Sequence, residues 1–290
     1  MKSFSLIGAG KVGTTLGKAL SEAGYTIRSL SCATLPEAEE SRRIIGRGEP
    51  SIDNIHTAQN GEILFISVPD DRITNVVQEL DSSDIFWQKK TVFHCSGLIP
   101  SEVLKPLRAK GASTASFHPI QSFSNKHASS GIFQNTYFGL EGEEQAVTIG
   151  RKIVRDLGGR SIQIRPEDKP IFHAAFSITS NFFVVLLDSA VALLKTSGLS
   201  EEKAVQILRP LLDGTLKNIK EENSVRSALT GPVIRGDGQT VKAHLGALKN
   251  FPGVEAVYRQ LALRALEMVK EEKTLTTRKI KELCRILEDR

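Results

Sequence analysis

Cysteine is scarce in this 290-residue sequence, and its three thiols are Cys32, Cys95 and Cys284. Their odd number, their wide spacing and the lack of a C-x-x-C pair argue against a disulfide framework and against a zinc motif. No long apolar run is uninterrupted either, because the most apolar stretch, residues 174–194, contains Asn181 and Asp188. We therefore expect reduced thiols, no bound metal and no membrane span, and we interpret residues 174–194 as a buried helix.

The sequence also lacks a recognisable export signal, since its first apolar run, residues 4–7, leads directly into a glycine-rich turn. Charge of one sign is not in large excess: 38 Lys and Arg residues stand against 33 Asp and Glu residues. Acids are interleaved even in the most basic stretch, residues 278–290. This pattern is typical of solvated helix faces, so we expect a cytoplasmic protein that binds no nucleic acid.

The strongest motif present is the G-x-G-x-x-G turn of residues 8–13, which follows an apolar strand and opens a helical pattern. The first glycine permits the tight turn, the second lets the backbone approach a pyrophosphate, and the third lets the helix pack on the strand. The free N–H groups at the helix start would bind the phosphates. The motif predicts a dinucleotide site, the alternative being a glycine-rich corner that binds nothing. The residues expected to bind are Gly8, Gly10, Lys11, Val12 and Gly13.

No acid follows the second predicted strand, residues 26–31. In NAD-binding domains a carboxylate at this point accepts hydrogen bonds from the ribose 2′-hydroxyl. This sequence places Ser31 and Thr34 there instead, and their hydroxyls could donate to a 2′-phosphate. Arg42 or Arg43 could fold back from the next helix, or could form a solvent-facing helix turn. We therefore predict NADP(H) as the cofactor.

Three further predicted strands end in turn residues, and the carboxyl ends of parallel strands form the ligand-binding edge of a doubly wound sheet. The strands of residues 63–68 and 91–95 deliver four expected cofactor contacts: Val68, Pro69, Ser96 and Gly97. A third, residues 113–117, is followed by His118, a candidate for contact with the substrate or the nicotinamide. We expect His94 and Cys95 to be core residues, because hydride transfer needs no nucleophile.

Beyond residue 165 the pattern changes from alternating strands and helices to an almost wholly helical one. The sequence therefore predicts an α/β protein, with a doubly wound Rossmann domain over residues 1–165 and an all-α second domain over residues 166–290. The second domain is expected to bind substrate and to form a homodimer, because the apolar surface of residues 182–194 exceeds what a lone helical domain covers.

The segment of residues 169–195 carries one polar stripe on an otherwise apolar helix. The polar side chains of such a stripe need hydrogen-bond partners, which either a solvent-filled ligand cleft or a polar interface with another helix could provide. Its members are Lys169, His173, Ser177, Ser180, Asn181 and Asp188. Further on, the glycine-rich loop of residues 229–238 could bring Arg235 to a ligand or into a salt bridge.

The order of these motifs resembles a family of NADP-dependent oxidoreductases in which a Rossmann domain precedes a helical domain of unknown function. That family is similar in architecture to ketopantoate reductase, the hydroxyacid dehydrogenases and pyrrolinecarboxylate reductase. The resemblance to ketopantoate reductase implies a helix lysine, matched by Lys169, and an asparagine one turn on, where this sequence has His173 and an asparagine only at Asn181. The His-Pro pair at His118 also resembles prephenate dehydrogenase, whose histidine holds the substrate hydroxyl.

The sequence and the resemblance together predict an NADPH-dependent reductase of a small anionic 2-oxo acid. Ketopantoate, a precursor in pantothenate biosynthesis, is the single substrate we expect. Lys169 or His173 would be the general acid, Asn181 would orient the carbonyl, and Arg235 would hold the carboxylate. The alternatives are a prephenate-dehydrogenase-like oxidation through His118 and a non-catalytic NADP(H) sensor.

Overall fold

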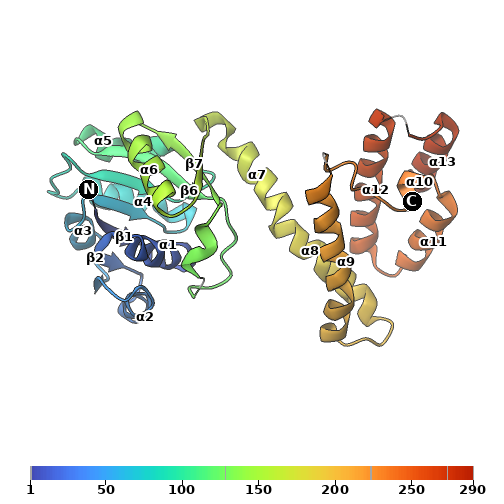
Figure 1. Cartoon of the computed structure of the whole chain (residues 1–290), viewed down its shortest axis with the longest axis horizontal. Helices are drawn as coiled ribbons and strands as arrows, with labels where there is room; N and C mark the ends of the chain where they lie inside the picture. Colours follow the sequence, from blue (N-terminus) through green and yellow to red (C-terminus); the bar gives the residue numbers. More distant parts are fainter. Residues whose placement is uncertain (1, 128, 223, 273, 290) are drawn as a thin grey trace. The chain divides into compact units, whose positions relative to one another are not determined.

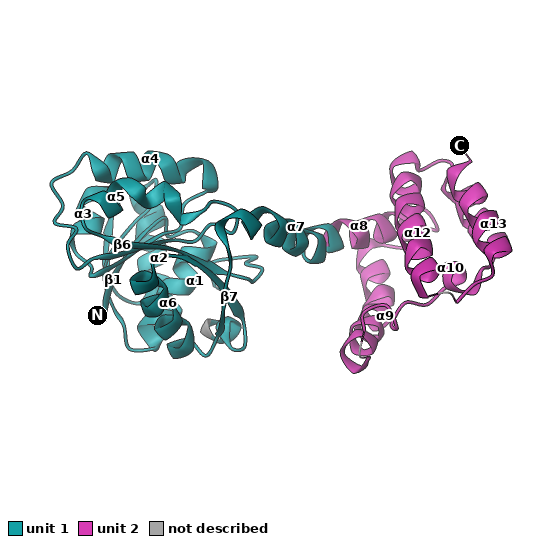
Figure 2. Ribbon diagram, turned by 90° about the horizontal axis from the view of Figure 1, so that it is seen from above, with its two compact units in different colours: residues 1–183 teal, residues 184–290 magenta. Residues whose placement is uncertain are grey.

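The computed structural model describes residues 2–127, 129–222, 224–272 and 274–289. The chain forms two compact units, residues 1–183 and 184–290, shown in teal and magenta in Figure 2. The predicted boundary at residue 165 follows the last strand, whereas the first unit also includes the helix of residues 169–179. Lys169, the first residue of that helix, donates hydrogen bonds to Ser116 in the sheet and to the Ser96 carbonyl beside it.

The first unit is built on an eight-stranded sheet of order β3-β2-β1-β4-β5-β6-β7-β8 (Figure 1). The strands are β1 (Ser3–Ile7), β2 (Thr26–Ser31), β3 (Glu49–Ser51), β4 (Ile63–Ile66), β5 (Thr91–His94), β6 (Ser113–Pro119), β7 (Tyr137–Gly142) and β8 (Arg160–Gln163). All neighbouring pairs are parallel except β6 and β7, which are antiparallel. The strand order reverses between β1 and β4, and this switch point defines the doubly wound architecture that the sequence predicts.

Helices cover both faces of this sheet. They are α1 (Lys11–Glu22), α2 (Leu35–Ile45), α3 (Asn54–Gln59), α4 (Asp70–Asp81), α5 (Lys105–Ala109) and α6 (Glu144–Asp156), with 3-10 turns η1 (Ser101–Leu104), η2 (Ser130–Phe133) and η3 (Pro166–Asp168). One hydrophobic cluster joins the sheet to α1, α2 and α6, and a second joins its other face to α3, α4 and α5. Because side chains alternate along a strand, β1 supplies Leu6 to the first cluster and Ile7 to the second.

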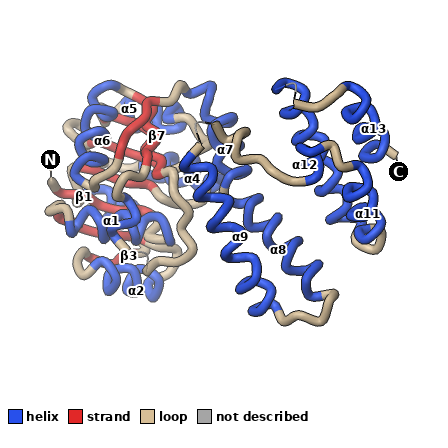
Figure 3. Tube along the Cα trace, turned by 45° about the vertical axis from the view of Figure 1, so that its right-hand side comes forward, coloured by secondary structure: helices blue, strands red, loops and turns tan. Residues whose placement is uncertain are grey.

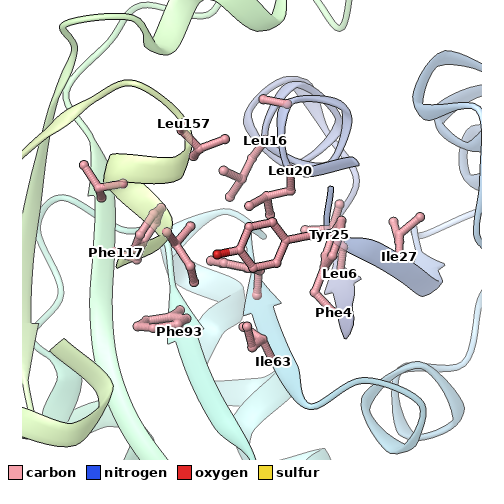
Figure 4. Close-up of a cluster of buried hydrophobic side chains, with 14 of the residues drawn as sticks. Phe4, Leu6, Leu16, Leu20, Tyr25, Ile27, Ile63, Phe93, Phe117 and Leu157 are labelled. Carbon is pink, nitrogen blue, oxygen red and sulfur yellow. The ribbon is translucent and has the colours of Figure 1, made fainter. Parts of the chain in front are cut away.

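The first cluster is rich in phenylalanine. Phe65, Phe93 and Phe117 come from three adjacent strands, and their ring centroids lie 5.3 to 5.4 Å apart. Leu16 and Leu20 of α1 gather around the same cluster in Figure 4. Each of these residues is fully buried, which fixes the strands and thereby the positions of the residues that follow them.

The segment of residues 169–195 departs from its prediction. It consists of two helices, α7 (Lys169–Thr179) and α8 (Asn181–Lys195), which meet at Ser180. The prediction of a buried helix is wrong, because Lys169 is the buried residue of α7 and Val191 that of α8 among the described residues. By length and composition alone, residues 166–195 are apolar enough to cross a membrane, since an 18-residue window within them has a mean hydropathy of 1.7.

The described residues of the second unit are helices joined by loops, as the blue and tan tube of Figure 3 shows. They are the remainder of α8 and then α9 (Glu201–Glu221), α10 (Pro232–Arg235), α11 (Gly238–Leu248), α12 (Pro252–Glu272) and α13 (Thr277–Glu288). Val241, Leu266 and Leu283 form the centre of its hydrophobic core. The α/β fold with a helical second part is thus confirmed, although the predicted loop of residues 229–238 contains the short helix α10.

Candidate functional site

The glycine turn lies between β1 and α1, at the carboxyl edge of the sheet. Gly8 has a φ of +87°, and its N–H donates to the Ser31 carbonyl at 2.9 Å. A Cβ on Gly13 would lie 2.5 Å from the Gly8 carbonyl oxygen, closer than real Cβ atoms come. The first and third glycines of the motif are therefore required by the fold itself.

Gly10 differs from both, because a Cβ there would meet no atom of the described chain within 4 Å. It is the N-cap of α1, and no described side chain caps that helix end. The first N–H groups of α1, from Lys11, Val12 and Gly13, are left unpaired within the helix and are available to an anion. Packing within the described chain therefore does not require a glycine at this position.

A cavity of about 650 Å³ adjoins this turn. Five of the predicted cofactor residues line it: Gly8, Gly10, Ser31, Val68 and Pro69. The Ser31 hydroxyl donates to Asn54 Oδ1 at 2.8 Å. The Thr34 side chain instead caps α2 by accepting from the Glu37 N–H. The walls of the cavity are thus formed by the uncapped start of α1, the end of β2 and the end of β4.

The structure does not place Arg42 and Arg43 in this cavity. Both line a separate surface hollow with Gly48, and Arg43 Nε donates back to the Glu39 carbonyl within α2. The interpretation that one of them folds back toward the cofactor is therefore wrong, because the last turn of α2 carries them away from the end of β2. Lys126, which the sequence analysis did not single out, lines the cavity instead.

A second cluster of polar residues lies at the ends of β5 and β6, around Lys169. This lysine is 3% exposed. Its Nζ donates to Ser116 Oγ at 2.6 Å and to the Ser96 carbonyl at 3.2 Å. Burial lowers the pKa of Lys169 to about 8, although the charges of Glu141 and Asp70 act in the opposite direction. A lysine in this state carries a proton at neutral pH and can release it at little cost.

His118 packs directly against the turn that follows β5. Its imidazole Cε1 lies 2.6 Å from the position that a Cβ on Gly97 would take, so a glycine is needed there. Its ring centroid is 6.3 Å from that of His173, on the first turns of α7. Burial and, to a smaller extent, the charges of Lys169 and His173 together lower the pKa of His118 to about 4. His118 is therefore a neutral imidazole at pH 7.

His94 is a core residue, as the sequence predicts, and Cys95 is partly buried against the first hydrophobic cluster. His94 is fully buried, its Nδ1 accepts from the Ser96 N–H at 3.2 Å, and burial lowers its pKa to about 3. Burial raises the pKa of the Cys95 thiol to about 12, which leaves no reactive thiolate at neutral pH. Ser96 Oγ accepts from the Leu98 and Ile99 N–H groups and so fixes the turn above them.

Two further predicted site residues lie at exposed positions. Asn181 is exposed at the start of α8, and Arg235 is exposed in α10 of the second unit. Their assigned roles stay predictions. Among the described residues there is no group of three or more His, Cys, Asp and Glu side chains placed to hold a metal ion.

The fold and these sites define the class of the protein, one that joins a Rossmann-like domain to a helical domain of unknown function. The Rossmann-like family model matches residues 2–119. The model of the domain of unknown function DUF2520 matches residues 136–265. The combination that the motif order resembles is thus confirmed. A comparison with curated proteins returned no match.

Solved structures share the whole arrangement. A proposed NADP oxidoreductase from Bacteroides fragilis is 24% identical, with a TM-score of 0.78 over 91% of this chain and 97% of that one. Protein TM1727 from Thermotoga maritima is 28% identical, with a TM-score of 0.70 over 93% and 99%. A pyrroline carboxylate reductase from Plasmodium falciparum with NADP bound is 14% identical, with a TM-score of 0.61 over 94% and 97%.

Proposed function

We propose that the chain is an NADP(H)-dependent oxidoreductase that reduces a small anionic 2-oxo acid. The observation that carries this proposal is the buried Lys169 ammonium beside His118, at the same edge of the sheet as the open glycine turn. Ligands of doubly wound sheets bind at this edge. The similar structures support the class of reaction, since one is described as an NADP oxidoreductase and another holds NADP.

The residues present fit a dinucleotide. The uncapped start of α1 would hold the pyrophosphate, Gly10 leaves room for its approach, and Val68 and Pro69 would line the cofactor farther along. When bound, NADPH would supply a hydride to the substrate carbonyl carbon. The turn at Ser96 and Gly97 would support the nicotinamide end of the cofactor, because the turn is fixed by its own hydrogen bonds and by the hydrogen bond from Lys169.

The proton that must reach the carbonyl oxygen would come from Lys169. Two of its three N–H groups are bonded to Ser116 and Ser96, which leaves one for a substrate oxygen. His118 cannot serve as a cationic acid with a pKa of about 4, but its neutral ring can hydrogen-bond the substrate. His173 lies next to His118 and is the alternative donor.

Reductase activity is expected to fall as the pH rises through about 8. The Lys169 ammonium is present below its pKa of about 8 and is lost above it, so kcat/KM should decrease about tenfold per pH unit on the alkaline side. The measurement is the pH profile of NADPH consumption. A Lys169→Arg variant with residual activity should lose this alkaline limb, because arginine stays charged. An unchanged limb in that variant would assign the titration to another group.

Ketopantoate is the first substrate to test, because it is small, anionic and a 2-oxo acid. Its carboxylate suits Arg235, and Asn181 would orient its carbonyl, as the resemblance to ketopantoate reductase implies. Consumption of NADPH with ketopantoate would support a role in pantothenate biosynthesis in the cytoplasm. If the protein turned over other 2-oxo acids but not ketopantoate, the proposed reaction class would stand and only the proposed substrate would change.

One observation favours a second reaction, a prephenate-dehydrogenase-like oxidation. The neutral imidazole of His118 can accept a hydrogen bond from a substrate hydroxyl, the group that such an oxidation converts to a carbonyl. The discriminating result is the direction of turnover, since this reaction would reduce NADP with prephenate. Tight NADPH binding with turnover in neither direction would instead support a non-catalytic sensor.

We further propose that two copies of the chain associate through α8 and α9. Apolar side chains on both helices are exposed, among them Val184 at 64% and Leu211 at 67%. An apolar surface of this kind marks an interface. The double change Val184→Asp and Leu211→Asp is expected to halve the mass measured by light scattering. The control Phe86→Asp removes an equally exposed residue, 69%, from the first unit and should leave the mass unchanged. A wild-type mass of one chain would contradict the dimer.

A further inference from the structure

The cavity at the glycine turn contains a cation that lies outside the nucleotide motif. Lys126 is in the segment between β6 and η2, far along the chain from the glycine turn, and it lines the cavity with Gly8, Gly10 and Ser31. Its Nζ lies 2.7 Å from Glu40 Oε2 and 3.4 Å from Ser41 Oγ. The side chain is held at the α2 wall although 20% of it is exposed.

This wall is the one next to the end of β2. The Ser41 hydroxyl, which Lys126 contacts, donates to the Ala9 carbonyl within the glycine turn at 2.8 Å. Cys32, the residue after β2, lines the same cavity; burial raises the pKa of its thiol, and the charge of Lys126 opposes that rise. Lys126 is thus placed where doubly wound domains discriminate between a ribose 2′-hydroxyl and a 2′-phosphate.

We infer that Lys126 is the residue that selects NADP(H) over NAD(H), by pairing with the 2′-phosphate from a loop outside the nucleotide motif. The inference rests on the proposed function, because it presumes that the cavity holds a dinucleotide. Lys126 would leave Glu40 and bind the phosphate with a charge-assisted hydrogen bond. Glu37 lies in the same wall and would repel a phosphate that no cation neutralises.

Arg72 is the competing cation in the described lining. It is on the first turn of α4, follows the end of β4, and its Nε lies 3.9 Å from Asp71 Oδ2. Arg72 thus follows the end of β4, whereas Lys126 is bonded to Glu40 and Ser41 of α2, and we therefore assign the 2′ position to Lys126. Arg42 and Arg43 face a different hollow, as described above.

The test is calorimetric titration of the wild-type chain and its variants with NADPH, NADH, 2′,5′-ADP and 5′-AMP. Lys126→Ala is expected to weaken NADPH and 2′,5′-ADP by about ten- to a hundredfold, and to change NADH and 5′-AMP by less than about threefold. Arg42→Ala is the matched control and should change none of the four. Glu40→Gln should tighten NADPH severalfold, because Lys126 then has no ion pair to break.

The outcomes separate this inference from the proposed function. Equal weakening of NADPH and NADH by Lys126→Ala, or the same NADPH loss in Arg42→Ala, would overturn the inference while dinucleotide binding stands. A wild-type preference for NADH would overturn it as well. A wild-type chain that binds none of the four probes would overturn the proposed function.

Discussion

Replacing Lys169 by methionine is expected to lower kcat/KM by at least about a hundredfold while the chain stays at least as stable as the wild type at neutral pH. The activity falls because the ammonium that would protonate the substrate oxygen is lost. Stability is kept because methionine has a similar length and needs no hydration. The Ser116 hydroxyl and the Ser96 carbonyl already share a hydrogen bond of 3.3 Å, so neither loses its last partner.

The stability effect follows from the direction of the pKa shift. The pKa of Lys169 is lowered from 10.5 to about 8 in the folded chain, so the folded state disfavours the ammonium. Burying the ammonium lowers the free energy of unfolding by roughly 3 kcal/mol, and the hydrogen bonds of Lys169 offset part of this loss. The loss is fully present below pH 8. It disappears as the pH rises from about 8 to 10.5. Wild-type stability should therefore rise in this window relative to Lys169→Met, as measured by urea unfolding.

Lys90 provides the matched control. It is also a partly buried lysine whose pKa burial lowers, and its Nζ donates to the Gln59 and Gly61 carbonyls. It precedes β5, so it lies at the amino edge of the sheet, opposite the candidate site. Lys90→Met should keep wild-type kcat/KM. Full activity in Lys169→Met would remove this lysine from the mechanism, and a gross loss of stability would make it a structural residue.

The second large effect is expected from alanine at two glycines of the same turn. Gly10→Ala should fold normally and weaken NADPH binding by about a hundredfold, because its Cβ meets no described protein atom within 4 Å and projects where a pyrophosphate would lie. Gly13→Ala should destabilise the fold by several kcal/mol, since its Cβ would come within 2.5 Å of a backbone oxygen. The two variants thus separate a ligand-binding glycine from a structural one.

Thermal unfolding and NADPH titration of the two variants measure this difference. Gly214→Ala in α9 is the control, because its Cβ also meets no described atom within 4 Å and alanine is the better helix former. It should keep NADPH affinity and unfold at the same temperature or slightly higher. If Gly10→Ala bound NADPH as tightly as the wild type, the pyrophosphate could not lie against Gly10.

Most of the first unit is readable from the sequence. Continuous apolar strands, turn residues at their ends and the glycine motif are local signals, and they predicted β1, β2, β4, β5 and β6 and hence the edge at which the candidate residues gather. The burial of His94 followed from the same pattern, because it is the last residue of a strand that is buried throughout.

What escaped prediction depends on contacts between distant segments. Lys126 reaches the cavity from a loop with no motif, and Ser116 accepts from Lys169 only because β6 and α7 meet in the fold. The sequence indicated excess apolar surface on residues 182–194, but apolar periodicity shows that a face is to be covered and not what covers it, so the exposure of nearly all of α8 was not predicted. The break at Ser180 has no proline or glycine to signal it.

The central claim is that the cavity and the Lys169 cluster form one reductase site, and NADPH consumption tests it most directly. The absorbance of the reduced nicotinamide should fall when wild-type protein, NADPH and ketopantoate or another small 2-oxo acid are mixed, and should fall more slowly with NADH. No consumption with any of these acids, in a sample shown to bind NADPH, would contradict the claim.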